Sequence, residues 1–380
     1  MPREIPRKSY ELVRAKPAEK CPPYSSGGAR MRTSGVYISA VGVDLPDCAD
    51  VQQAIEDGLL DAAVAEESGF IGVAVAQDTP APEMAVRATR QALERWTGDP
   101  SELGALFYVD SFPSGPAGWL PQSYLMREVV GGDLLAVGVR QGCNGVFGAL
   151  ELAAAYLEGT PAEAVLITAT DNMSSPLVDR WRSSPGYILG DGASAAILTS
   201  SPGFARLLSV TSMTVPGIEA VHRGTQSLNP STLPTGQKLD LGARMEEFRL
   251  GGGDYSELVS KSRQAQNELL AAALDEARID IGDIKRVAFP HGSVKNVRAG
   301  ATALGFRMEQ TTWEYGCRVG HVMASDQLLS LDHLLHTHEI GPGDRVLLMG
   351  YGPGLGIAAA VVEITDRPHW LARTDGQNDR

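Results

Sequence analysis

Residues 137–157 combine a strand, a glycine-flanked break and a helix around one cysteine. The stretch begins with the β-branched segment VGV, breaks at Gly142-Cys143-Asn144-Gly145, and continues with apolar residues at helical spacing. A cysteine at such a break lies at a helix N-terminus, where unpaired N–H groups and the helix dipole favour thiolate over thiol. The glycines permit a sharp turn and leave the sulfur open to a substrate. The stretch therefore predicts a nucleophilic cysteine, with a small buried thiol as the alternative.

The composition is typical of a compact α/β protein with one large or two ordinary domains. The chain has 380 residues, of which 43% are hydrophobic and 42 are glycine. Its net charge of −13 argues against a nucleic-acid or anionic-membrane surface. No apolar run approaches the ~18 residues that a membrane span needs. The four cysteines are scattered and no secretory signal is recognisable, so we expect reduced thiols and a cytoplasmic location.

Three regions follow one another along the chain. Residues 1–30 are rich in proline and without periodicity, which predicts a disordered or loosely docked arm. Residues 31–203 and 204–380 each mix strands and helices, and each places a reactive residue type at a strand end. Among the predicted elements are one continuous helix over residues 50–67 and another over 82–96. This order predicts two similar α/β halves packed together, with the site between their strand ends. The loop over residues 112–121 is a candidate pocket wall.

Two histidines and an aspartate are candidate partners for the cysteine. His291 follows a predicted buried strand and precedes a glycine, so it is either a structural hydrogen-bonding group or a general base. His321 and Asp326 lie where a loop leads into a predicted helix, where Asp326 or Ser325 is alternatively an N-cap. In a Cys/His/Asp set, the thiolate attacks a thioester, the imidazole transfers protons, and the carboxylate orients the imidazole.

Two further patterns are weaker. The glycine-rich residues 350–356 superficially match a dinucleotide fingerprint, but no helix follows them. Such a turn instead suits a backbone N–H directed at a developing oxyanion. Three histidines at positions 333, 336 and 338 cluster near one helix end, but no cysteine or carboxylate set of suitable spacing accompanies them. We therefore expect no metal site.

Five stretches together resemble the ketoacyl-ACP synthase III branch of the thiolase superfamily, over about residues 31–364. They are GCNGVFGALELA around Cys143, LGDGASAAIL, the PHG that contains His291, GHVMASDQLLSL from Gly320, and GYGPGLGIAAAVV near the end. The resemblance implies a five-layered αβαβα thiolase fold of two duplicated halves and an obligate homodimer. It also implies acylation of Cys143 by a thioester, with His291 as the partner imidazole. No cofactor is expected beyond an acyl-ACP or acyl-CoA donor.

The departures from this family pattern bear on the reaction. Condensing members use an asparagine with the histidine to bind the thioester oxygen during decarboxylation of malonyl-ACP, and His321 stands in the place of that asparagine. With Asp326 following, the chain is similar to the acyltransferase subgroup of antibiotic and polyketide pathways, which pairs Cys and His with Asp. Those proteins pass an acyl group from a carrier protein or CoA to a hydroxyl or amine, often on a sugar or polyketide. Residues 67–77 lack the Trp and Arg-Thr-Gly elements that hold CoA in typical members, which favours a carrier-protein donor.

The leading hypothesis is a ping-pong acyltransferase in natural-product biosynthesis. Cys143 takes the acyl group, and His291, oriented by Asp326, deprotonates the acceptor. The Cys143 N–H helps to bind the oxyanion, with His321 and Gly354 as secondary groups, because Pro353 has no N–H to donate. One alternative is a decarboxylative ketoacyl synthase in which a protonated His321 replaces the amide donor. Another is a non-catalytic partner subunit that shapes a chain-length pocket.

Overall fold

The computed structural model describes residues 30–174, 177–215, 218–228 and 237–371. The predicted N-terminal arm lies outside this range except for Arg30, the first residue of β1 (Arg30–Arg32). The division of the chain near residue 204 stays a prediction.

The strands form one sheet made of two sets, which are joined by a short pairing between β2 and β9. On one side the order is β2-β8-β7-β5-β6, and on the other it is β9-β12-β11-β10 with β1 beside β9. The first set is β2 (Tyr37–Asp44), β5 (Leu103–Val109), β6 (Leu135–Val139), β7 (Ala164–Asp171) and β8 (Gly192–Thr199). The second is β9 (Ala205–Thr214), β10 (Ile284–Ala288), β11 (Arg345–Gly352) and β12 (Gly356–Ile364). The two sets meet where Tyr37 and Ile38 of β2 pair with Arg206 and Ala205 of β9.

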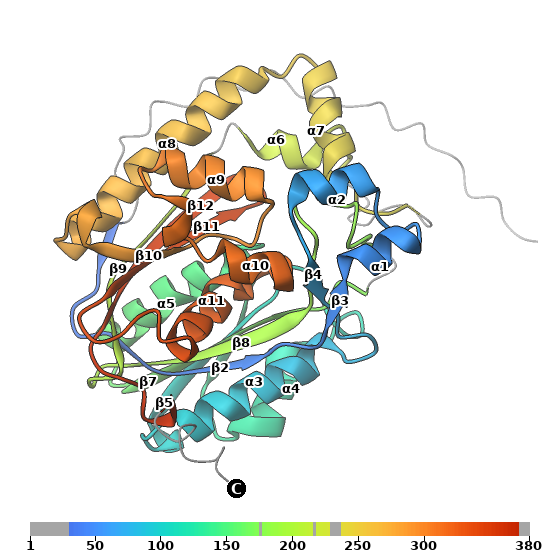
Figure 1. Cartoon of the computed structure of the whole chain (residues 1–380). Coiled ribbons are helices and arrows are strands. Elements are labelled where there is room, and N and C mark those ends of the chain that lie inside the picture. Colours follow the sequence, from blue (N-terminus) through green and yellow to red (C-terminus); the bar gives the residue numbers. More distant parts are fainter. Residues whose placement is uncertain (1–29, 175–176, 216–217, 229–236, 372–380) are drawn as a thin grey trace, which may run out of the picture.

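Helices form the other three layers (Figure 1). The central layer is α5 (Gly145–Gly159) and α11 (Asp326–His336), packed between the two sets of strands. The outer face of the first set is covered by α3 (Ala81–Arg95) and α4 (Pro121–Leu125), and that of the second set by α8 (Tyr255–Ala277) and α9 (Val294–Ala303). The expected five-layered αβαβα thiolase fold is therefore confirmed. A small sheet of β3 (Cys48–Asp50) and β4 (Gly72–Ala74) lies beside it. The remaining α-helices of the described ranges are α1 (Val51–Glu56), α2 (Ala62–Ser68), α6 (Glu219–Arg223), α7 (Leu241–Leu250) and α10 (Trp313–Val319).

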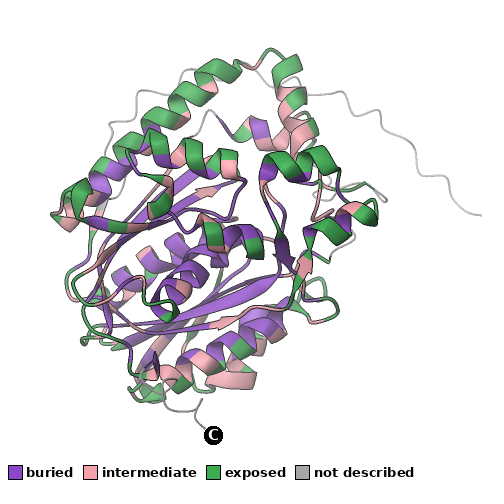
Figure 2. Ribbon diagram, in the orientation of Figure 1, coloured by how far each residue is buried: buried purple, intermediate pink, exposed green. Residues whose placement is uncertain are grey.

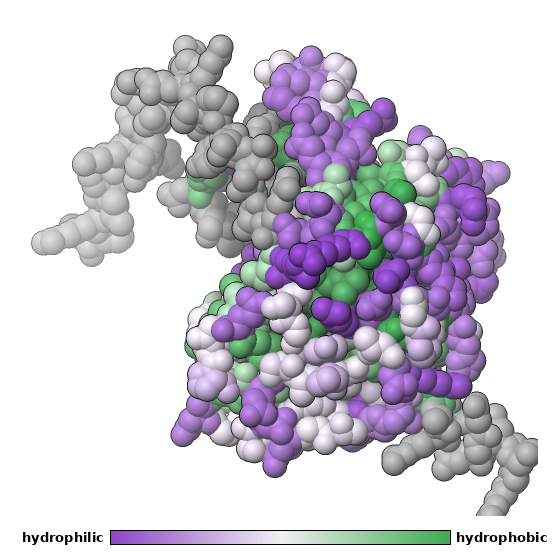
Figure 3. All heavy atoms as spheres, turned by 90° about the vertical axis from the view of Figure 1, so that its left-hand side faces the viewer, coloured by the Kyte–Doolittle hydropathy of each residue, from purple (hydrophilic) through white to green (hydrophobic). Residues whose placement is uncertain are grey.

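The burial pattern follows from the layering. Every residue of β7 and β8 is buried, as expected of strands covered on both faces. The central helices α5 and α11 are largely buried, whereas α8 and α9 present exposed residues to the outside (Figure 2). The face shown in Figure 3 is mostly hydrophilic, with hydrophobic side chains in a band across its middle. None of the helices in the described ranges is both long enough and apolar enough to cross a membrane.

The prediction of one helix over residues 50–67 was wrong, and its cause is local. Gly58 has a φ of +70°, which ends α1, and Asp61 then caps α2 by accepting hydrogen bonds from the N–H groups of Ala63 and Val64. The helix predicted over residues 82–96 is confirmed as α3.

Parallel pairing explains where the site forms. β5 pairs in parallel with both β6 and β7, so the carboxyl ends of these three strands lie at one edge. Cys143 follows β6, Phe112 follows β5 and Met173 follows β7, and the three side chains pack in one apolar cluster. β10 and β11 are likewise parallel, and His291 follows the end of β10.

Candidate active site

Cys143 occupies the turn between β6 and α5, as the sequence predicts. It is buried, with 8% of its surface exposed. Gly142 has a φ of +56°, and a Cβ atom there would lie 2.6 Å from Cδ of Pro353. This position therefore requires glycine both for its backbone conformation and for the close approach of the β11–β12 turn.

His321 is the imidazole that contacts the sulfur. Its Nε2 lies 3.0 Å from Sγ of Cys143. Gly320, with a φ of +76°, ends α10 and turns the chain so that His321 reaches Cys143. The backbone is then tied down, because the His321 N–H donates to the Ile188 carbonyl at 2.7 Å and the His321 carbonyl accepts from Gly190 N–H at 2.8 Å. These bonds anchor the imidazole to the segment that leads into β8.

Asp326, the first residue of α11, orients this imidazole. Its Oδ2 lies 2.5 Å from Nδ1 of His321 and accepts from the main-chain N–H of His291 at 2.7 Å. Its Oδ1 accepts from the N–H of Val322 at 2.7 Å. The carboxylate is fully buried, and its bonds leave little freedom to rotate. Cys143, His321 and Asp326 are thus in contact one after the other, in the order of a catalytic triad.

His291 also contacts Asp326, but its hydrogen bonds go to groups other than the sulfur. Its Nδ1 is 2.9 Å from the Gly320 carbonyl and 3.3 Å from Oδ1 of Asp326, and its Nε2 is 2.9 Å from Oγ of Ser330. Both ring nitrogens are therefore engaged by groups other than Cys143. The expectation that His291 is the imidazole beside the nucleophile does not match this geometry, because the turn at Gly320 gives that place to His321.

The charges in the triad support one another. Burial alone would lower the pKa of His321, but the Asp326 carboxylate and the Cys143 sulfur outweigh it and raise this pKa well above 6.5. Burial would raise the pKa of Asp326, but the two neighbouring imidazoles, His291 and His321, hold it below 3.8. For His291 burial dominates, and its pKa falls below 6.5 despite Asp326. At neutral pH we therefore expect an ionised Asp326, a protonated His321 and a neutral His291.

The Gly354 N–H, a candidate oxyanion donor from the sequence, has another partner. It donates to Nδ1 of His222 at 3.0 Å. His222 belongs to α6, in an irregular part of the chain where the sequence showed no sign of a site residue. The bond does not agree with a role for Gly354 in binding the oxyanion, and it shows that α6 packs against the β11–β12 turn.

A cavity of about 950 Å³ adjoins the cysteine cluster. Phe112, Met173 and Val178 line the cavity and also belong to the apolar cluster that contains Cys143. The predicted role of the loop over residues 112–121 as a pocket wall agrees with this arrangement. Charged groups, among them Asp171 and Arg244, line other parts of the cavity.

Asn144 is a second residue that the sequence did not single out for function. It is fully buried next to Cys143 in the chain, and neither atom of its side-chain amide has a hydrogen-bond partner in the described structure. Glycines at positions 350, 352 and 356 make room for it, since a Cβ atom at each would lie between 2.5 and 3.3 Å from the Asn144 amide. Within the described ranges, no three His, Cys, Asp or Glu side chains have the arrangement that a metal ion needs.

Two protein-family models match the chain at the segments that carry the site. The model described as 3-oxoacyl-[acyl-carrier-protein (ACP)] synthase III matches residues 138–215, which include Cys143. The model of the C-terminal part of that synthase matches residues 274–364, which include His291, His321 and Asp326.

Individual proteins extend the likeness to most of the chain. The beta-ketoacyl-[acyl-carrier-protein] synthase III of Streptomyces lividans is 25% identical over 300 residues, covering 75% of this chain and 80% of that protein. The mycobacterial synthase III of Mycobacterium marinum is 26% identical over 293 residues, covering 76% and 83%.

Solved structures agree. ChlB3, described as an acyltransferase, is 46% identical with a TM-score of 0.83, covering 88% of this chain and 99% of that one. The 3-oxoacyl-[acyl-carrier-protein] synthase III of Aquifex aeolicus has a TM-score of 0.69 at 19% identity, covering 86% and 99%, and at that identity it supports the fold alone.

Proposed function

Because this chain belongs to the ketoacyl-ACP synthase III family of the thiolase superfamily, in its acyltransferase subgroup, we propose that it transfers an acyl group to a hydroxyl or amine. The donor is a carrier-protein or CoA thioester, the intermediate is an acyl-enzyme on Cys143, and no carboxyl group is lost. The acceptor is a small molecule of natural-product biosynthesis, such as a sugar, a polyketide or an amine. The observation that carries the proposal is a chain of two contacts, from Asp326 to His321 and from His321 to Cys143.

The first half of the reaction loads the enzyme. The Cys143 sulfur, paired with the protonated His321, attacks the thioester carbonyl, and a tetrahedral intermediate forms. The C–S bond to the donor breaks as Nε2 of His321 gives its proton to the departing thiol. The Cys143 N–H contributes to the oxyanion site.

The second half unloads it. Acylation removes the negative charge on sulfur, which is one of the groups that raise the pKa of His321. The neutral imidazole then accepts the proton of the acceptor hydroxyl or amine, whose oxygen or nitrogen attacks the acyl carbonyl. The Cys143 thiolate leaves, and the protonated His321, held by Asp326, stabilises it.

A decarboxylative condensation is the second candidate, since curated relatives carry the name beta-ketoacyl synthase III. That reaction needs donors directed at the thioester oxygen while an enolate forms, and one such donor contributes roughly 3 kcal/mol. Here both nitrogens of His291 have other partners, and within the described ranges His321 is the imidazole that contacts the sulfur. This arrangement favours acyl transfer, in which one base activates an alcohol or amine, over condensation, in which two donors bind the enolate oxygen.

We also propose that the chain acts as a homodimer through the free edge of β6. In the described sheet β6 pairs with β5 on one side only, and its first residue, Leu135, is 49% exposed. An apolar unpaired edge is a template for pairing with another strand. The adjoining loop also exposes Trp119 and Leu120. A second copy of the chain, which the family resemblance implies, is the partner that this edge suits.

Mass spectrometry of the intact protein tests the reaction. Incubation with acyl-CoA or an acyl carrier protein should add one acyl mass, which Cys143→Ala abolishes. Addition of an alcohol or amine should remove that mass and yield an ester or amide. A ketoacyl product with release of labelled CO₂ from a malonyl donor would establish the condensing alternative. Failure of thioesters and iodoacetamide to label Cys143 would instead favour a non-catalytic partner subunit.

A further inference from the structure

We infer that His291 is a positioning residue, which acts through Asp326 and not by contact with the sulfur or the acyl group. This inference rests on the proposed function. His291 is buried, with 2% of its surface exposed, and none of its hydrogen bonds in the described structure reaches Cys143. Nδ1 of His291 lies 3.3 Å from Oδ1 of Asp326 and Nδ1 of His321 lies 2.5 Å from Oδ2, so that two imidazoles share one carboxylate.

His291 supplies two of the groups that hold the carboxylate. Its main-chain N–H donates to Oδ2 of Asp326 at 2.7 Å, and its Nδ1 lies 3.3 Å from Oδ1. Since Oδ2 is also the atom that contacts His321, the orientation of this oxygen determines the orientation of the catalytic imidazole. A buried carboxylate with all its donors in place keeps its charge and its direction.

The surroundings select one tautomer of His291. The neighbours of Nδ1 are both oxygen acceptors, the Gly320 carbonyl and Asp326, so Nδ1 carries the proton. Oγ of Ser330 lies 2.9 Å from Nε2 of His291, and the Ser330 hydroxyl donates to Oγ1 of Thr312 at 3.2 Å.

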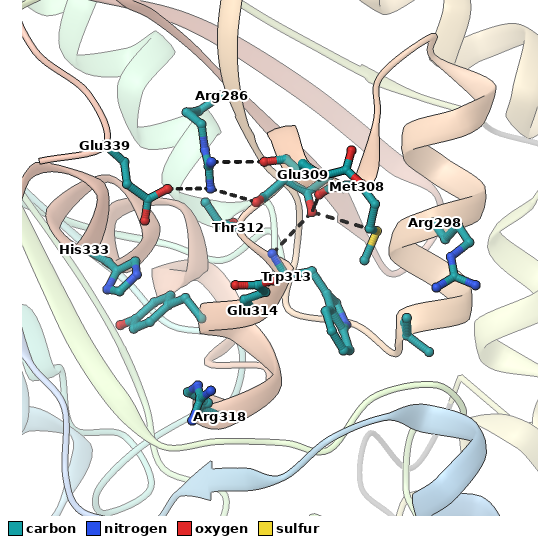
Figure 4. A pocket seen from close by; sticks show the side chains of 13 residues that line it. Arg286, Arg298, Met308, Glu309, Thr312, Trp313, Glu314, Arg318, His333 and Glu339 are labelled. Carbon is teal, nitrogen blue, oxygen red and sulfur yellow. Dashed lines mark hydrogen bonds and ion pairs between the residues drawn. The ribbon is translucent and has the colours of Figure 1, made fainter. Parts of the chain in front are cut away.

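Thr312 connects this network to a second cavity, of about 510 Å³, whose wall is shown in Figure 4. Tyr315 lines the same cavity, and its ring meets the His291 ring edge-on at 5.5 Å between centroids. Hydroxyl groups and an aromatic ring thus hold His291 from behind. They hold the ring with Nδ1 hydrogen-bonded to the Gly320 carbonyl at 2.9 Å and 3.3 Å from Oδ1 of Asp326, between the residue that precedes His321 and the carboxylate that contacts it.

Variants of residue 291 that replace one ring nitrogen at a time provide the test. The amide nitrogen of asparagine can occupy the position of Nδ1, the amide nitrogen of glutamine can occupy that of Nε2, and leucine has neither. All three variants keep the main-chain N–H of residue 291. We expect His291→Leu to slow acylation, acyl transfer and iodoacetamide alkylation of Cys143 at pH 6 alike, by about 10- to 100-fold. His291→Asn should restore most of each rate, and His291→Gln little. Ser330→Ala should slow them about 2- to 10-fold. His336→Asn, on the far end of α11, is the control and should change none.

The outcomes separate positioning from direct catalysis. If the Leu, Asn and Gln variants all alkylate normally but none transfers its acyl group, His291 is the base of the second step and the inference is overturned. Normal rates in all of them would overturn it too. If His291→Leu does not fold, the ratio of Asn to Gln decides, and equal rates refute the inference. Alkylation of Cys143 needs no acceptor. If the variants show the expected order of alkylation rates but the wild-type protein transfers its acyl group to no alcohol or amine, the proposed function is refuted and the inference on His291 stands.

Discussion

Replacing Asp326 with asparagine should disable the base and leave the nucleophile in place. The carboxylate oxygens of Asp326 accept hydrogen bonds from the His321 ring, the His291 main-chain N–H and the Val322 N–H, and Nδ1 of His291 lies 3.3 Å from Oδ1. An amide in either orientation must direct its NH₂ group at one or more of these donors. With NH₂ toward His321, the imidazole is forced into the tautomer that has no free Nε2 acceptor. With NH₂ toward Val322, two N–H groups meet at about the 2.7 Å that the present bond spans.

The magnitude follows from these losses. A hydrogen bond to a charged group contributes about 1.5–3 kcal/mol, and the wrong tautomer in an acid–base triad costs about 10⁴-fold in kcat. We expect acyl transfer to slow by about 10³- to 10⁴-fold. Because Asp326 raises the pKa of His321, that pKa should fall, and the alkylation rate of Cys143 near pH 6 should fall with it.

Single-turnover transfer from a preloaded acyl-enzyme measures the effect, and alkylation from pH 5 to 9 measures the change in His321. The matched control is Asp332→Asn, on the same helix, because Asp332 is also largely buried but pairs with Arg95. Asp332→Asn should lower the free energy of unfolding but leave the rate of acyl transfer by the folded protein unchanged. Transfer within about threefold of wild type in Asp326→Asn would refute the assignment of the triad.

Three other variants test the surroundings of the site. His222→Leu leaves the Gly354 N–H without its acceptor and should cost about 1 kcal/mol in guanidinium unfolding. Burial and then Arg244 lower the pKa of His222, so its imidazole is neutral in the folded protein above that pKa. The difference in unfolding free energy between wild type and variant should therefore be complete above pH 6.5 and vanish as the pH falls through the folded-state pKa. A difference that grows in acid would contradict this explanation. Gly142→Ala combines a positive φ with a Cβ contact of 2.6 Å, so it should lower the free energy of unfolding more than Gly35→Ala does. Gly35 has a φ of +75° but no atom near the added Cβ. Equal losses of stability would count against the close approach at Gly142. Leu135→Arg on β6 should convert the dimer to a monomer in sedimentation experiments, whereas an unchanged mass would exclude this edge.

The turn that places Cys143 between a strand and a helix was predictable because its determinants are local. A β-branched strand, two glycines and a helical apolar pattern surround Cys143 within one stretch, and β6 and α5 form there as expected. The layers were predictable because they follow from the resemblance and from strands such as β7 and β8, whose apolar runs indicate burial on both faces.

The choice between the two imidazoles was not predictable in the same way. Each follows a strand or turn and lies near a glycine, so spacing alone does not tell which ring faces the sulfur. The decision is made by contacts distant in sequence, above all the bonds of His321 to Ile188 and Gly190. Ser330 had one usable signal, since it lies four residues after Asp326 on the same helix face. His222 had none, because its partner is 132 positions away.

The backbone bridge at His321 has a mechanical consequence. His321 comes from late in the chain, yet its main chain is hydrogen-bonded to the segment between β7 and β8, which belongs with the strands beside Cys143. A small rocking of one set of strands against the other across the narrow β2–β9 seam would thus carry the imidazole along with the sulfur. The 3.0 Å spacing between Nε2 of His321 and Sγ of Cys143 would be kept under such a displacement.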